Sequence, residues 1–499
     1  MRAKANLSAV ALAAALLCAC SLNYTVTGGK DPVTQPDNQS ETAATVAVVN
    51  GKTRLVVSYN DETGQAAKIQ YANSTSRLAL KGATQMGWSW SDDGGKTWTH
   101  GGPLASPQGF SILWGDPAMA TSGKNKNVVF LSSLAVPDSK MPPGGISGSL
   151  STFGVLGYPI GGACIAKSTD GGKSFVQWHC VQNTTPAGAD QFATNGHFYD
   201  GGAMASTPNG AVFAAYNDTE TGKIDVWTAP DENGSFTQMA NPFPGKTAVL
   251  HPRMRVGPNG ILYLAAEMLT NNGGVALFMT RFVGGVWTNP VQVAQGSEAG
   301  PAVDFGSTVQ GSKLTVRTAA QFGFDVGTAS AQGNDAVRIL ETHKSGGRLF
   351  LEGTACSANL QTCAVMSGWQ LGPSSATPLD LYNPDVVAWW GDKTNEATWQ
   401  ASFMERYGTS VTKVNVSRTT LGYVNGTPLV FPVNITKDVP VCSDTRGYWG
   451  DYDGMILVGP AAQGGMSWMR FYTDSASACS KRWVFVAREQ HVSQASYDY

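Results

Sequence analysis

The stretch Ser91-Asp92-Asp93-Gly94-Gly95-Lys96-Thr97-Trp98 recurs as Ser168-Thr169-Asp170-Gly171-Gly172-Lys173-Ser174-Phe175. Both copies fit the pattern Ser-x-Asp-x-Gly-x-Thr/Ser-Trp/Phe, and both run into strand-like sequence. Ser and Asp side chains hydrogen-bond nearby backbone amides, and glycine adopts turn geometry that a Cβ would resist. The closing aromatic ring supplies an apolar plug for a hairpin. The motif therefore predicts two equivalent structural turns, built on Ser91, Asp93, Gly95 and Trp98 and on Ser168, Asp170, Gly172 and Phe175.

A longer repeat surrounds these turns. Its units begin at Trp114-Gly115-Asp116-Pro117, Tyr199-Asp200-Gly201-Gly202, His251-Pro252-Arg253, Pro301-Ala302-Val303-Asp304, Asn383-Pro384-Asp385 and Trp449-Gly450-Asp451-Tyr452. Each start leads into a short apolar strand, and Pro-Asn-Gly at 208–210 and 258–260 is a hairpin turn signal. A further unit over about residues 44–100 precedes them, so the chain contains six or seven units.

The two turns resemble the Asp-box (BNR) repeat of sialidases and related β-propellers. In that family the box is a structural turn away from the active site, and we expect the same here. The resemblance implies an all-β fold, a β-propeller of six or seven four-stranded blades with Asp-box hairpins. Repeats of this size suit radial closure. A likeness of fold does not by itself assign an activity.

The N-terminus resembles a bacterial lipoprotein signal. Arg2 and Lys4 precede an apolar run over 9–17, and Leu17-Cys18-Ala19-Cys20 resembles a lipobox with Cys20 as the lipidated residue. The apolar run is too short for an ordinary transmembrane helix. Ser21 resembles the sorting pattern of the outer membrane. We expect a lipid-anchored protein of the bacterial cell envelope, in the outer membrane; a plain secretory signal is the alternative.

The chain divides into three parts on this interpretation. Residues 1–19 are the signal peptide, residues 20–43 are a lipid-anchored flexible tether poor in large apolar side chains, and residues 44–499 are one β-propeller domain. Six cysteines remain in the mature body, and their spacing predicts the disulfides Cys164–Cys180, Cys356–Cys363 and Cys442–Cys479. A zinc site is the rival, but there is no C-x-x-C pair to support it.

Composition excludes several classes of function. Lys and Arg number 34 against 36 acids, and removal of residues 1–19 takes away two positive charges, which leaves a net charge of −4. This balance argues against nucleic-acid binding. We expect no cofactor and no catalytic metal, although an Asp-rich loop leaves a structural calcium ion open. The expected partner is a glycan or glycoconjugate, with the membrane reached through the lipid anchor only.

The repeat has a consequence for function. In a propeller the innermost strands start near one mouth of a central channel, so the polar residues at those starts converge on one face. These residues are Asp116, Asp200, Arg253, Asp304, Asp385, Asp451 and Tyr452. We expect a polar or ion-binding channel mouth. The alternative is that each Asp caps a turn before Pro or Gly.

The sialidase resemblance also implies a catalytic set. Sialidases hold a substrate carboxylate with three arginines, attack with a Tyr paired to a Glu, and use an Asp as acid/base. The candidates here are Tyr452, Glu267, Arg253, Arg255, Arg446 and Asp116, with Glu405 as a second partner for the Tyr and Arg281 following Glu267. The Phe-Arg-Ile-Pro motif of the family is absent, and neither Arg54 nor Arg77 stands in its context. One arginine of the triad therefore has no match.

Three hypotheses follow. The chain is an exo-sialidase-like glycoside hydrolase, a non-catalytic propeller that binds glycan or protein, or an envelope scaffold. The second hypothesis needs only polar groups and exposed aromatics, such as Trp389, Trp390 and Trp449. The third predicts an apolar surface patch.

Overall fold

A computed structural model describes part of the chain, and every regular element in that part is a β-strand. The described residues are 21–25, 39–61, 83–138, 161–182, 199–219, 221–249, 251–295, 303–309, 312–316, 322–328, 335–345, 348–371, 379–389, 398–407, 413–421, 423–424, 427–428, 433–440, 455–460, 466–475 and 482–490. Across these ranges no helix has the length and apolarity needed to cross a bilayer.

The strands form seven sheets of four or five strands, which we number in chain order. The first sheet contains β2 (Gln39–Val49), β3 (Lys52–Asp61), β5 (Met86–Ser91) and β6 (Thr99–Pro103). The second contains β7 (Phe110–Thr121), β8 (Val129–Pro137), β9 (Gly162–Ser168) and β10 (Gln177–Gln182), with β4 (Ala83–Thr84) parallel to β7. The third contains β11 (Tyr199–Ser206), β12 (Val212–Asp218), β13 (Lys223–Ala229) and β14 (Thr237–Gln238).

The remaining sheets follow the same order. The fourth contains β15 (Arg253–Val256), β16 (Leu262–Leu269), β17 (Val275–Val283) and β18 (Val286–Trp287), with β19 (Val291–Ala294) also paired to β17. The fifth contains β22 (Phe322–Thr328), β23 (Asp335–Ser345), β24 (Arg348–Ser357) and β25 (Cys363–Leu371). The sixth contains β26 (Leu379–Trp389), β27 (Thr398–Tyr407), β28 (Lys413–Thr420) and β31 (Val433–Pro440). The seventh contains β32 (Met455–Pro460), β33 (Met466–Ser475), β34 (Arg482–Gln490) and β1 (Ser21–Thr25).

Two small sheets stand apart from this series. One pairs β20 (Val303–Val309) with β21 (Ser312–Val316), and the other pairs β29 (Tyr423–Val424) with β30 (Thr427–Pro428).

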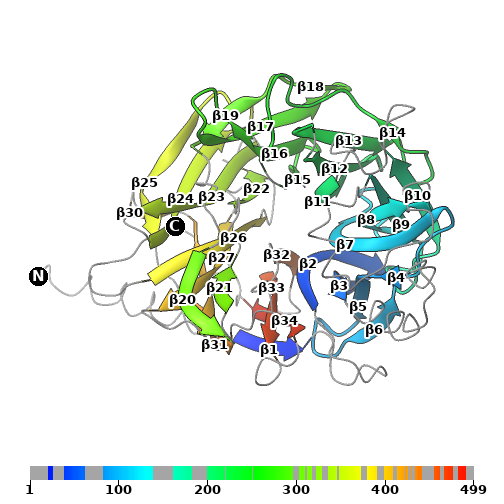
Figure 1. Ribbon diagram of the computed structural model, residues 1–499, viewed down its shortest axis with the longest axis horizontal. Helices are drawn as coiled ribbons and strands as arrows, with labels where there is room; N and C mark the ends of the chain where they lie inside the picture. Colours follow the sequence, from blue (N-terminus) through cyan, green and yellow to red (C-terminus); the bar gives the residue numbers. More distant parts are fainter. Residues whose placement is uncertain are drawn as a thin grey trace, which may run out of the picture.

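The seven sheets surround a common centre (Figure 1). Their first strands, β2, β7, β11, β15, β22, β26 and β32, contact one another in that order, and β32 contacts β2 again. These innermost strands belong to sheets whose main strands pair antiparallel, each with the next along the chain. Radial repetition of antiparallel four-stranded sheets is the architecture of a β-propeller.

The first and last described strands pair in the seventh sheet. β1 pairs antiparallel with β34, with Ser21 opposite Glu489 and Thr25 opposite Phe485. Residues 21–25 and 39–43, within the span expected to be a tether, are therefore strands and not tether. Polar composition does not prevent this, because backbone N–H and C=O groups pair along a strand edge whatever the side chains are.

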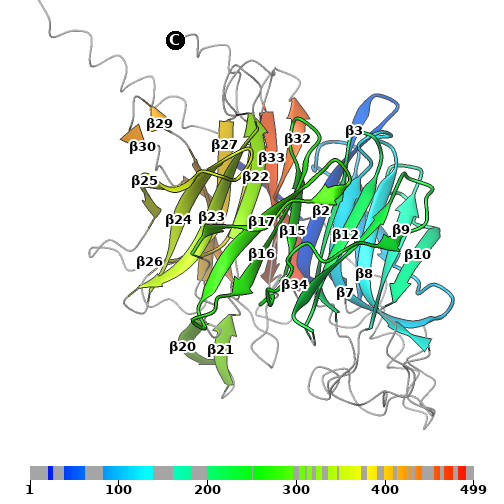
Figure 2. The ribbon, with the colours of Figure 1, turned by 90° about the horizontal axis from the view of Figure 1, so that it is seen from above.

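The ring has two faces that we name by their loops. The innermost strands begin at the mouth face and end at the turn face, where β2 turns into β3 through Asn50 and Gly51. Figure 2 shows the turn face at the top and the β20–β21 sheet on the opposite side. Both repeated Ser-x-Asp motifs lie at the turn face, since they connect β5 to β6 and β9 to β10.

The core lies between neighbouring sheets. Phe130 and Ile165 of the second sheet pack with Val212 and Tyr216 of the third. Every residue of β8 and β9 is buried, as expected for strands covered on both faces. The seventh and first sheets are joined by Leu55, Val57, Val458 and Met469, among others, so packing continues where the ring closes.

The first motif forms the turn that its sequence predicts. Ser91 Oγ accepts the N–H of Gly95 at 2.8 Å and donates to Asp93 Oδ1 at 2.8 Å. Asp93 Oδ1 also accepts the N–H groups of Lys96 at 3.0 Å and Thr97 at 2.9 Å. One short polar pair therefore satisfies most of the donors in the loop.

The second motif makes the same bonds. Ser168 Oγ accepts the N–H of Gly172 at 2.7 Å, and Asp170 Oδ1 accepts those of Lys173 and Ser174 at 3.0 Å each. Burial opposes ionisation of Asp170, but the hydrogen bonds from Ser174 and Ser168 outweigh it and hold the pKa of that carboxyl below its usual value. Gly172 has a φ of +85°, a left-handed conformation that favours glycine.

The aromatic ends of the two motifs are plugs, as the sequence predicts. Phe175 is 7% exposed and meets Trp88 edge-on, with ring centroids 5.6 Å apart. The indole of Trp98 donates to the carbonyl of Gly95 at 3.2 Å and packs on the seam between the seventh and first sheets.

Two of the three expected disulfides are confirmed. Cys164–Cys180 joins β9 to β10 at directly opposed positions, and Cys356–Cys363 joins β24 to β25 in the same way. Both close hairpins whose pairing already holds the sulfur atoms near each other. Cys442, Cys479 and the expected lipidation residue Cys20 lie outside the described residues.

Arg54 connects the two Ser-x-Asp turns. Its Nε lies 2.5 Å from Asp92 Oδ1, and its Nη1 donates to the backbone carbonyl of Asp170 at 2.7 Å. The Arg54 side chain is 6% exposed, whereas that of Asp92 is 54% exposed. The buried guanidinium therefore joins the first sheet to the second at the turn face.

Replacement of Arg54 by Met should lower the free energy of unfolding by about 2–3 kcal/mol, because hydrogen bonds to a charged group are lost and a carbonyl loses its donor. Urea unfolding of both proteins measures the change. Lys52→Met, which removes an exposed cation from the same strand, is the control and should change stability by less than about 0.5 kcal/mol. Equal losses in the two variants would contradict the role of Arg54.

Candidate functional site

A cavity of about 390 Å³ lies at the centre of the ring. All seven innermost strands, β2, β7, β11, β15, β22, β26 and β32, contribute to its lining. Its volume falls in the range of small-molecule sites, about 300–1,000 Å³. The cavity is where the repeat predicted polar side chains to converge.

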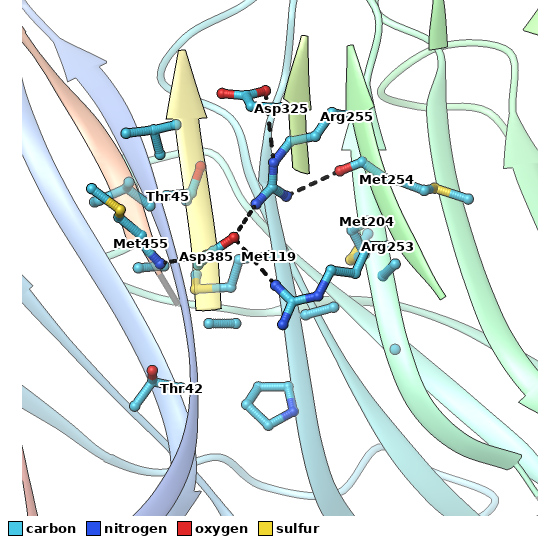
Figure 3. A pocket seen from close by; sticks show the side chains of 18 of the residues that line it. Thr42, Thr45, Met119, Met204, Arg253, Met254, Arg255, Asp325, Asp385 and Met455 are labelled. Atoms are coloured by element: carbon cyan, nitrogen blue, oxygen red, sulfur yellow. Dashed lines mark hydrogen bonds and ion pairs between the residues drawn. The ribbon is translucent and has the colours of Figure 1, made fainter. Parts of the chain in front are cut away.

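Two arginines of β15 share one carboxylate in this cavity (Figure 3). Arg253 Nη1 and Arg255 Nη2 each lie 3.4 Å from Asp385 Oδ1. The Asp385 side chain is 1% exposed, while those of Arg253 and Arg255 are 18% and 30% exposed. The carboxylate is therefore sealed behind the guanidinium groups, which partly face the cavity.

Asp325 of β22 completes the network. Its Oδ1 lies 3.8 Å from Arg255 Nε, and its Oδ2 accepts the N–H of Ala388 at 2.7 Å. Burial raises the pKa of Asp325 to about 6, although the positive charge of Arg255 and two backbone hydrogen bonds favour its ionised form. Asp325 therefore exchanges its proton in mildly acidic solution.

The sequence analysis missed Asp325 and placed Asp304 in its position. Asp304 lies in β20 of a two-stranded sheet, and the innermost strand of the fifth sheet is β22. The expected place of Asp304 on an innermost strand is therefore wrong, because β20 pairs with β21 outside the seven-sheet series, whereas its place at the channel mouth stays a prediction. The available signal was Asp325 inside the apolar run Phe322-Gly323-Phe324-Asp325-Val326.

Each of three aspartates bonds to the next innermost strand. Asp116 Oδ2 accepts the N–H of Gly201 at 3.2 Å, across from β7 to β11. Asp325 of β22 accepts the N–H of Ala388 in β26. Asp385 Oδ2 of β26 accepts the N–H of Met455 in β32 at 2.8 Å. These aspartates are therefore clamps between sheets as well as lining groups.

Asp116 and Asp385 do not stand at strand starts. Asp116 lies within β7 and Asp385 within β26, beside register shifts where each strand bulges. Asp116 and Asn383 have φ values of +52° and +51°, and Glu41 in β2 has +51°. A left-handed residue at a bulge re-aims the side chains next to it. The sequences Asp116-Pro117 and Asn383-Pro384 therefore mark bulges within strands, not the first residues of strands.

The bulge at Asp116 is held by the first sheet. Asn60 Oδ1 accepts the N–H of Asp116 at 2.8 Å, and Asn60 Nδ2 donates to Glu41 Oε2 at 2.6 Å. Asp200 precedes the left-handed Gly201 and is half-buried at the mouth face. These contacts hold Asp116 in place for its bond to Gly201, and its expected catalytic role stays a prediction.

Glu267 lies on β16, next to the strand that carries the two arginines. It lies fully buried in β16, and with Glu341 and Glu352 it raises the pKa of His343 against the opposing effect of burial. Arg281 stands opposite Tyr263 in the sheet, whereas Glu267 stands opposite Leu277. Glu405, the other expected partner of the tyrosine, is buried in β27, and both partner roles stay predictions because Tyr452 lies outside the described residues.

The expected nucleophile cannot be placed. Tyr452, Arg446 and Asp451 lie outside the described residues, as do Trp390 and Trp449. A different tyrosine–carboxylate pair is present, since Tyr199 Oη donates to Asp225 Oδ2 at 2.9 Å. Burial and the charge of Asp225 raise the pKa of Tyr199, so this pair does not provide an activated phenolate.

The described residues lack the side-chain clusters that bind metal ions. Among the described residues, no group of three or more His, Cys, Asp or Glu side chains is arranged to hold a metal ion. The network at the cavity is instead composed of two guanidinium groups and two carboxylates.

Comparison with known proteins gives likenesses of structure only. No protein-family model and no curated protein matches the chain. A protein of unknown function from Dyadobacter fermentans is 14% identical, with a TM-score of 0.39, over 83% of this chain and 98% of that one. An α-L-arabinofuranosidase from Fusarium graminearum is 12% identical, with a TM-score of 0.41, over 95% and 97%. The NanB sialidase of Streptococcus pneumoniae is 12% identical, with a TM-score of 0.43, over 79% and 69%. No residue role is transferred from these proteins.

Asp325→Asn should change the pH dependence of stability. The folded-state pKa of about 6 exceeds the ordinary value of 3.8, so the stabilising contribution is complete below about pH 4 and is lost as pH rises through 6. Because Asn does not titrate, the unfolding free energy of the wild type minus that of the variant should fall between pH 4 and pH 7.

Urea unfolding at pH 4, 5, 6 and 7 measures this difference. Asp231→Asn, which removes an exposed carboxylate on a turn, is the control. A wild-type-minus-variant difference for Asp325→Asn that stays constant with pH would refute the titration.

Proposed function

We propose that this chain is a cell-envelope lipoprotein whose propeller binds an uncharged glycan at the mouth of the central cavity and does not hydrolyse sialosides. The observation that carries the proposal is the pairing of Arg253 and Arg255 with the buried Asp385. This pairing bears on the charge of the ligand, which the fold alone does not specify.

The pairing matters because the sialidase resemblance implies arginines that are open to a substrate carboxylate. Here two guanidinium groups face two carboxylates, and the formal charges cancel. A ligand carboxylate about 4 Å from Asp385 would be repelled by about 4 kcal/mol at an effective dielectric constant of about 20. An anionic sugar therefore gains little from these arginines.

A neutral sugar suits the same groups. Hydroxyl oxygens accept hydrogen bonds from guanidinium N–H groups, of which each arginine has five. Thr42 and Thr45 of β2 and Asp325 also line the cavity and add hydroxyl and carboxylate groups. Such a mixture supplies both donors and acceptors, as polyhydroxylated ligands require.

The architecture of the proposed binder has seven blades. Each of the seven sheets is one blade, and β1 is the outer strand of the last blade, so both ends of the chain close the ring. The support for this is the pairing of β1 with β34 and the contact of β32 with β2.

The proposed location follows from the N-terminus. Residues 1–19 are removed as a signal peptide, and Cys20 carries the lipid that holds the protein in the outer membrane. The support is the Leu17-Cys18-Ala19-Cys20 sequence alone.

Hydrolysis of sialosides is the second candidate. The family resemblance favours it, and Tyr452 with Arg446 would be its missing groups. Against it stands the pairing of Arg253 and Arg255 with Asp385.

A chain beginning at Ser21 should show no turnover of a fluorogenic sialic-acid glycoside and should bind neutral glycans in preference to sialylated ones on a glycan array. Arg253→Met should weaken that binding at least tenfold, because a hydrogen-bond donor to the ligand is lost, about 1.4 kcal/mol or more. Lys52→Met is the control. Sialoside turnover, or a preference for sialylated glycans, would refute the proposal.

Asp385→Asn should shift the preference toward carboxylate-bearing glycans by at least tenfold, since the arginines lose their competing anion. Asn retains an acceptor for the N–H of Met455, so the fold should persist, and circular dichroism checks this. An unchanged preference in a folded variant would show that Asp385 does not set the ligand charge.

A further inference from the structure

The turn face carries five exposed lysines on the first two sheets. They are Lys52 after the β2–β3 turn, Lys96 and Lys173 in the two Ser-x-Asp turns, and Lys124 and Lys126 between β7 and β8. Lys96 and Lys173 occupy the same position of the repeated motif, so the repeat itself places two of these charges.

The loops that bear these lysines pack side by side. The N–H of Val48 donates to the carbonyl of Lys126 at 2.8 Å, and the N–H of Gly171 donates to the carbonyl of Asn127 at 2.8 Å. Arg54 joins the turn at Asp92 to the turn at Asp170. The five lysines therefore form one patch, although they span 52 to 173 in the sequence.

The acids of the same loops make contacts within the protein, although Asp92 and Asp93 are exposed. Asp92 pairs with Arg54, while Asp93 and Asp170 accept hydrogen bonds within their own turns. Other carboxylates of these sheets lie at the mouth face, among them Asp61 and Asp138 at the ends of β3 and β8. Glu232 of the third sheet accepts a hydrogen bond from Ser122 beside Lys124. The patch is positive all the same, because the five lysines and Arg54 outnumber Asp92, Asp93, Asp170 and Glu232, in a chain whose net charge is −2.

The start of the mature chain lies on this face. β34 ends at the turn face, because Met469 of the preceding strand β33 packs near Gly95 in the first Ser-x-Asp turn and β33 begins there. Ser21 is opposite Glu489, near the end of β34. Ser21, the first residue of β1, therefore lies at the turn face, in the sheet that packs against the first sheet.

We propose that the turn face lies against the membrane and that its five lysines bind anionic lipid headgroups, so that the cavity mouth points away from the bilayer. This rests on the proposed anchor at Cys20 and goes beyond it, since it gives the protein a second contact with the membrane and an orientation. With β1 directly after residue 20, little chain separates the anchor from the propeller.

Electrostatic attraction is the expected source of this contact. Lysine near an anionic surface strengthens binding by about fivefold per residue, and the effect falls off within about 10 Å at 0.1 M salt. The compact ammonium group on a flexible stem suits headgroup phosphates without fixed geometry. A lipid chain combined with a basic patch gives stable attachment where one weak signal does not.

The test uses the unlipidated chain beginning at Ser21 and vesicles of phosphatidylcholine with or without about one third phosphatidylglycerol. Cosedimentation in low salt should show binding to the anionic vesicles only, and 0.5 M salt should remove it. The variant with Lys52, Lys96, Lys124, Lys126 and Lys173 all changed to Gln should bind on the order of 1,000-fold more weakly. Lys223→Gln, at an exposed lysine on the mouth face, should bind as the wild type does.

The lysine contact and the lipid anchor are tested by separate measurements. No binding of the wild type to anionic vesicles, or equal binding by the five-lysine variant, overturns the lysine contact. Single Lys96→Gln and Lys173→Gln variants, each expected to lose about fivefold, keep the test decisive if the combined variant fails to fold. Labelling of the full chain with a radioactive fatty acid, with Cys20→Ala as control, tests the anchor independently.

Discussion

The ring depends on carboxylates that reach from one innermost strand to the backbone of the next. An innermost strand has one edge without a strand partner, so its N–H groups need acceptors from elsewhere. Asp116, Asp325 and Asp385 provide them for Gly201, Ala388 and Met455. Charge-assisted bonds of this kind stabilise by about 1.5–3 kcal/mol each, which makes them effective links between sheets whose other contacts are apolar.

The same constraint decides the chemistry of the cavity. Asp385 is in place to accept the N–H of Met455, and from that position its second oxygen lies 3.4 Å from both Arg253 and Arg255. A clamp that holds the sheets together thus neutralises the arginines that a carboxylate-binding site would need. Asp325 of β22 likewise bonds to the backbone of the next innermost strand, at Ala388, and also contacts Arg255. On the proposed function, these two residues link the architecture to the charge of the ligand.

The two faces of the ring have different characters for a topological reason. Short turns end the innermost strands at the turn face, and the repeated Ser-x-Asp motif directs lysines outward there. In the cavity, bulges within β7 and β26 aim Asp116 and Asp385 at the backbone of the neighbouring strand.

Local hydrogen bonding and spacing were readable from the chain. The turns at Ser91 and Ser168, the hairpin disulfides Cys164–Cys180 and Cys356–Cys363, and the all-β class follow from contacts between residues close in sequence. The place of Asp325 in the cavity, the corrected position of Asp304, the strand at Ser21–Thr25 and the pairing of Arg253 with Asp385 did not. Arg253 and Asp385 are 132 residues apart, so only the closing of the ring decides that they meet. Short-range sterics and hydrogen bonds determine a turn within a few residues, whereas the partners of a buried charge depend on how distant strands are stacked.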